Sequence, residues 1–104
     1  MPKKNTTDAI KILAAMAGPK RQQAFEEEIA NREVAQKIYE LRQHAGLSQA
    51  ELARRVGTTQ SVISRLEDAD YEGHSLAMLN RIAAAVERRV EIRFVSRRRR
   101  LQTT

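Results

Sequence analysis

Two short helices joined by a tight turn are signalled within residues 48–67, and they constrain this chain more than any other feature. Ser48 precedes Glu51 by three residues, which is the spacing of a capping box, so a helix is expected to begin at Gln49. Gly57 then supplies a C-terminal stop. The first helix is therefore predicted to span only about two turns.

The second helix is predicted from about Gln60 to Glu67, after a turn over residues 57–59. Two short helices joined by a three-residue turn that begins with glycine have the geometry of a DNA-reading helix-turn-helix. That geometry needs a small residue where the helices cross, a turn residue that tolerates positive φ, and two inward apolar positions. The sequence meets these needs with Ala53, Gly57, Ile63 and Leu66.

Helical spacing of apolar residues also marks both flanks of this motif. It predicts an N-terminal helix over residues 7–17 and a long helical stretch over 20–44, which is either one bent helix or two divided near Asn31. Ser75 is expected to cap a further helix that reaches Val86. The chain is therefore expected to be mainly all-α, with five helices.

The segment 90–94 differs in kind, because apolar and charged residues alternate there as they do in a strand. A lone strand leaves its backbone groups unpaired, and the chain offers no second strand. The simplest partner is the same strand of a second copy, antiparallel across a two-fold axis. We therefore predict a homodimer whose strands contribute the apolar residues Val90, Ile92 and Phe94.

The net charge of +6 lies wholly at the C-terminal end of the chain. Residues 88–100 hold seven arginines and one acidic residue, whereas residues 1–87 hold twelve basic and twelve acidic residues. The overall charge is therefore no evidence for DNA binding by the helix-turn-helix. The run Arg97 to Arg100 is compatible with contacts to DNA phosphates, with contacts to a protein partner, or with no role.

Composition and spacing favour no enzyme, cofactor or metal site. The chain has no cysteine and only two histidines, which lie far apart in the sequence, and no nucleophile, base and acid occur at catalytic spacing. No apolar run is long enough to span a bilayer, and no secretory signal opens the chain. We therefore expect a cytoplasmic protein with no membrane partner and no small-molecule substrate.

The run of residues 46–60 resembles the Cro/C1-type (xenobiotic-response-element) family of lambdoid phage repressors, and the resemblance covers about residues 34–86. It implies a five-helix, lambda-repressor-like domain that binds DNA. In that family the residue pair matched by Arg42 and Glu67 is structural. The resemblance implies phosphate contacts from Gln49 and Thr59, and a further DNA contact from Thr58. It implies base contacts from Gln60, Ser61, Ser64 and Arg65.

Residues 67–76 and 89–94 further resemble antitoxins of the HigA type, which are cytoplasmic bacterial proteins. That resemblance implies a dimeric repressor of its own operon, bound to a near-palindromic operator, that also neutralises a RelE/HigB-like mRNA-cleaving toxin. A stand-alone phage-like regulator and a protein-interaction module are the alternatives. The expected organisation has four parts. Residues 1–30 form an N-terminal helical extension that binds a partner, and residues 31–87 form the helix-turn-helix domain. Residues 88–96 form a dimerising strand, and residues 97–104 form a basic tail.

Overall fold

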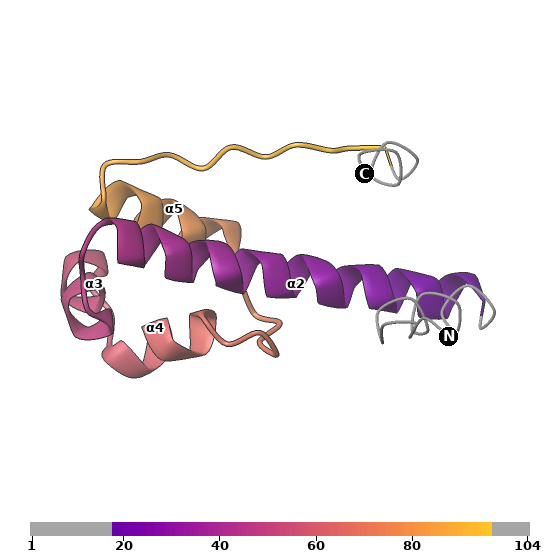
Figure 1. The fold of residues 1–104 in the computed structure, drawn as a ribbon, viewed down its shortest axis with the longest axis horizontal. Helices are drawn as coiled ribbons and strands as arrows, with labels where there is room; N and C mark the ends of the chain where they lie inside the picture. Colours follow the sequence, from indigo (N-terminus) through magenta and orange to yellow (C-terminus); the bar gives the residue numbers. More distant parts are fainter. Residues whose placement is uncertain (1–17, 97–104) are drawn as a thin grey trace, which may run out of the picture.

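The computed structural model describes residues 18–96, which contain four helices and no strand (Figure 1). The helix predicted over residues 7–17 and the tail over 97–104 lie outside the described residues. The mainly all-α prediction agrees with this part of the chain, whereas a count of five helices is not confirmed. The helices are α2 (Pro19–His44), α3 (Gln49–Val56), α4 (Gln60–Leu66) and α5 (Leu76–Ala85).

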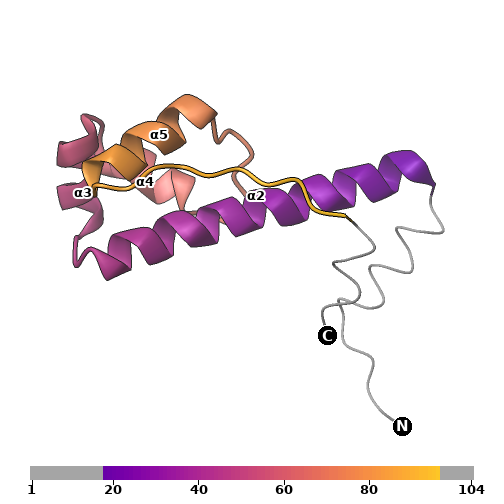
Figure 2. The same cartoon turned by 90° about the horizontal axis from the view of Figure 1, so that it is seen from above.

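Helix α2 is one continuous helix, so Asn31 does not divide it. Pro19 stands at its start, where the missing N–H costs nothing and the fixed φ suits a helix. Gly46, with a φ of 71°, redirects the chain immediately after the helix. The N-terminal half of α2 projects beyond α3, α4 and α5 in both views (Figures 1 and 2).

The predicted bounds of α3 are confirmed, and its capping box is complete. The Glu51 N–H donates to Ser48 Oγ at 3.0 Å, and the Ser48 N–H donates to Glu51 Oε1 at 2.8 Å. Gly57 ends the helix with a φ of 86° and donates its N–H to Ala53 O at 2.9 Å. A two-turn helix that is marginal by itself is thus closed at both ends.

Helices α4 and α5 are also capped by side chains, at Thr59 and Ser75. Thr59 Oγ1 accepts the Val62 N–H at 3.3 Å, and Ser75 Oγ accepts the Met78 N–H at 3.1 Å. Helix α4 ends one residue before the predicted Glu67, which serves as its C-cap.

An aliphatic core forms where the four helices meet. Leu52, Ile63 and Ile82 are fully buried, and each is worth about 1.5–3 kcal/mol of burial free energy. The remaining buried apolar residues of this cluster come from α2, α3 and α4 and are Ile38, Ala53, Val56 and Leu66.

The predicted C-terminal strand is not confirmed, because residues 88–96 form an extended segment that belongs to no sheet. The segment runs back along α2 toward the N-terminal end of that helix (Figure 2). Its residues 89–95 make no hydrogen bond with any other described residue. A strand is defined by pairing with another strand, so a single chain with one extended segment forms none.

None of the helices within residues 18–96 is long and apolar enough to cross a membrane.

Candidate nucleic-acid interface

Helix α4 has a buried face and a polar exposed face, and the two faces fix its rotation on the domain. Ile63 and Leu66 are 0% and 3% exposed, and they turn inward onto α3 and the core. Because α4 is held in this way, its outward positions project into solvent together. The outward residues are four that the sequence assigned to base contacts, namely Gln60, Ser61, Ser64 and Arg65.

The contact of α3 with α4 depends on Ala53 and on the turn at Gly57. Ala53 is 3% exposed at the core, where a larger side chain would separate the two helices. Arg81 of α5 adds a tie that the sequence did not suggest, since its Nη2 donates to Val56 O at 2.9 Å. The relative placement of the two short helices is therefore held from α5 as well as through the turn.

A buried ion pair joins the end of α2 to the end of α4. Arg42 donates through Nε and Nη2 to Glu67 Oε2 and Oε1, at 2.7 and 3.0 Å, and both side chains are largely buried. Arg42 also donates through Nη1 to Leu47 O at 2.9 Å. These hydrogen bonds with Glu67 raise the pKa of Arg42 despite the opposing effect of burial. The structure thus shows the Arg42–Glu67 pair that the resemblance implied.

Gln49 is part of the same network, which the sequence did not anticipate. Its Nε2 donates to Glu67 Oε1 at 3.1 Å. A side-chain amide carries two N–H groups, so one remains for a second acceptor. Glu67 therefore orients the residue at the start of α3 that is expected to contact a phosphate.

The two turn threonines have different surroundings. Thr58 is half-buried within the turn. Thr59 is exposed, and its hydroxyl oxygen accepts the hydrogen bond that caps α4. That hydroxyl also lies 3.3 Å from Ser61 Oγ. The expected DNA contacts of these two residues stay predictions.

The loop after α4 closes over the end of that helix. His74 Nε2–H donates to Leu66 O at 2.7 Å, and the Tyr71 ring meets His74 edge-on at a centroid distance of 5.1 Å. A Cβ at Gly73 would collide with the Tyr71 hydroxyl, so a larger residue there would force the Tyr71 ring to shift. His74 thus supports α4, and no group of His, Cys, Asp or Glu among residues 18–96 could hold a metal ion.

Arg54 and Arg55 are exposed in the last turn of α3. Cations there are favourable to the helix dipole whether or not they meet a phosphate. The position of these two arginines is therefore explained by the helix dipole with or without a DNA contact.

Comparison with protein families matches residues 38–87 to the family model described as helix-turn-helix. The match contains all of α3, α4 and α5 and begins within α2. Comparisons with curated proteins and with solved structures give no match.

Proposed function

We propose that this chain is a DNA-binding transcriptional regulator that represses transcription by reading the major groove with α4, and the helix-turn-helix match over residues 38–87 supports this proposal. The observation that carries this proposal is the exposed polar face of α4, held outward by buried Ile63 and Leu66. Gln60 suits the edge of an adenine, and Arg65 suits a guanine. Binding of this kind at a promoter excludes the polymerase.

Phosphate contacts are expected to set the position of the domain, and base contacts are expected to choose the sequence. Gln49 supports the first task, because Glu67 fixes one side of its amide and leaves one N–H for an acceptor. Thr59 in the turn is the second proposed phosphate contact, and Thr58 beside it is a further proposed DNA contact.

Selection of bound duplexes from a random pool tests this function directly. We expect one preferred sequence with two-fold symmetry and half-site centres 10–10.5 base pairs apart, or about 34–36 Å. Binding that shows no preference for any duplex sequence would refute the proposed regulator.

The symmetric site requires two copies of the chain, and we propose that residues 88–96 join them. The support is an extended segment whose residues 89–95 have no hydrogen-bond partner among the described residues. Ile92→Pro removes a backbone donor and should yield monomers in sedimentation. An intact dimer in that variant would contradict the proposed contact.

We further propose that the regulator is the antitoxin of a RelE/HigB-like toxin in the cytoplasm. The specific support is the projecting N-terminal half of α2, which precedes the matched domain and extends past it (Figure 1). A DNA reader does not need this projection. Phe25 and Ile29 give it half-buried apolar side chains, which are suited to a protein partner.

The antitoxin proposal is tested with the product of the adjacent gene, co-expressed with this chain. A small basic RelE-like protein should co-purify, and its mRNA cleavage should be suppressed. Ile29→Asp should release the toxin without loss of operator binding, whereas Ala30→Asp, at an exposed neighbouring position, should not. An adjacent gene of another kind would favour the stand-alone regulator, and a chain that binds protein but no DNA would favour the interaction module.

A further inference from the structure

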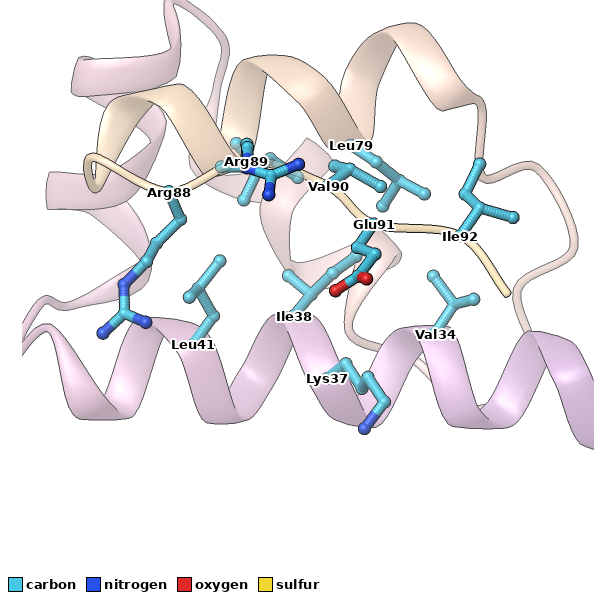
Figure 3. Close-up of a pocket in the computed structure, with 12 residues that line it drawn as sticks. Val34, Lys37, Ile38, Leu41, Leu79, Arg88, Arg89, Val90, Glu91 and Ile92 are labelled. Carbon is cyan, nitrogen blue, oxygen red and sulfur yellow. The ribbon is translucent and has the colours of Figure 1, made fainter. Parts of the chain in front are cut away.

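We infer that residues 88–96 of two copies pair antiparallel about Ile92, so that Phe94 of each copy docks in the groove between α2 and α5 of the other. This inference rests on the proposed homodimer and adds its register and the occupant of its groove. The groove has a volume of about 490 Å³ and is lined by α2, α5 and the extended segment (Figure 3).

The groove presents apolar side chains from three directions. Val34, Ile38 and Leu41 stand on the face of α2 that is turned toward the segment (Figure 3). Leu79 of α5 and Val90 of the segment line the groove as well. A volume of this size accommodates an aromatic side chain.

The extended segment leaves large apolar side chains uncovered beside this groove. Phe94 is 98% exposed and Ile92 is 60% exposed. Val95 beside them is 58% exposed, and neighbouring exposed apolar side chains of this kind mark protein–protein interaction sites. The backbone groups of residues 89–95 make no hydrogen bond with any described residue, so one partner strand would satisfy these groups and cover the side chains together.

Charge selects the register of that partner strand. In an antiparallel pair, residues directly opposite one another share a face of the ribbon. Pairing about Ile92 sets Val90 opposite Phe94 of the second copy and Glu91 opposite Arg93 of the second copy. Neither Glu91 nor Arg93 has an ion-pair partner among the described residues of one copy.

The neighbouring registers oppose like charges or pair fewer residues. Pairing about Glu91 opposes two glutamates and sets Arg89 against Arg93, and pairing about Arg93 opposes two arginines. Pairing about Val90 confines the ladder to residues 88–92, because Glu87 lies in a turn with a φ of 60°. Only the register about Ile92 pairs the whole of residues 89–95 with the same residues of the second copy.

The register places Phe94 of the second copy at the groove. Opposite residues have Cβ atoms about 4.5–5.5 Å apart on one face, and Val90, the residue opposite, lines the groove. By symmetry both grooves of the dimer are filled.

Single-cysteine variants test the register, because the chain has no cysteine of its own. Under mild oxidation in the absence of DNA, Ile92→Cys should form a covalent dimer, since opposite Cα atoms lie within disulfide range. Val90→Cys should not, because the two copies of that residue would lie about 13 Å apart along the ribbon. Val90→Cys combined with Phe94→Cys should again cross-link.

Charge exchange gives a second measurement. Glu91→Arg and Arg93→Glu should each weaken the dimer by about 3- to 30-fold in Kd, and the two substitutions together should restore it. Phe94→Ala should weaken the dimer more than Val95→Ala on the opposite face. A dimer that cross-links through Val90→Cys alone, or in which the double exchange is no better than either single change, would overturn the register and leave the regulator intact. A chain that remains monomeric at every concentration would overturn the proposed homodimer together with its register.

Discussion

At the scale of single residues, the structure shows how polar side chains fix the start of α3. Glu51 closes the capping box, and the hydrogen bonds from Ser48 lower the pKa of the Glu51 carboxyl below its ordinary value of 4.5. A carboxyl with a lowered pKa in the folded state contributes stability above its unfolded pKa and loses it as the pH falls through the folded pKa.

Unfolding by urea should therefore show a contribution from Glu51 that is present above about pH 4.5 and declines below it. Glu51→Gln keeps an acceptor for the Ser48 N–H but does not titrate. The variant should accordingly lose less stability than the wild type over the same acid range. Equal acid sensitivity of the two proteins would remove Glu51 as the cause.

The Arg42–Glu67 pair gives a second prediction at this scale. Glu67→Leu leaves the buried guanidinium of Arg42 without its carboxylate partner and should cost about 3–5 kcal/mol in the free energy of unfolding. Replacing both residues, as Arg42→Met with Glu67→Leu, should cost far less than the sum of the single changes. Denaturant titration of the wild type, the two single variants and the double variant measures this coupling. Additive effects would show that the pair is not coupled.

At the scale of the elements, the sequence predicted the helix-turn-helix closely because its signals are local. The cap at Ser48 and the stop at Gly57 lie within a few residues of the helix ends that they set. The hydrogen bonds from Arg81 to Val56 and from His74 to Leu66 join residues 25 and 8 positions apart, and no local pattern announces them. Gln49 was assigned to DNA, and its contact with Glu67 was equally invisible to a local pattern.

The turn between α3 and α4 carries a prediction of its own. Gly57 has a φ of 86°, and a Cβ there would lie in ordinary contact with Arg81 Nη2 at 3.5 Å. The cost of Gly57→Ala is therefore conformational, about 1–2 kcal/mol of folding free energy. Thermal unfolding checks the size of the effect, and Gly46→Ala at φ 71° with open space around it is a matched control of similar cost. No loss of stability at Gly57 would show that the turn does not need a left-handed residue.

At the scale of the whole molecule, the sequence could not separate a strand from an unpaired extended segment. The alternation of apolar and charged residues over 90–94 can be read from one segment, whereas a sheet needs two segments that pair with each other. For the same reason, the groove between α2 and α5 could not be foreseen from periodicity. It depends on how the segment after α5 returns along α2 (Figure 2).

The charge of the whole chain leads to a prediction about salt. Residues 97–104 hold four of the arginines, and their deletion should reduce the slope of log affinity against log salt by about 0.9 for each phosphate contact that the deletion removes. Operator titrations at several salt concentrations measure the slope. A slope equal to that of the intact chain would place this tail outside the DNA interface.

The central claim is that the outward face of α4 chooses the DNA sequence, and base preference in the Arg65→Ala variant tests it most directly. Sequences selected from random duplexes should lose preference at one position in each half-site, at a cost of about 1–3 kcal/mol for the wild-type operator. Gln60→Ala should relax a different position. A uniform loss of affinity with every base preference retained, or an operator unchanged in both variants, would contradict the account.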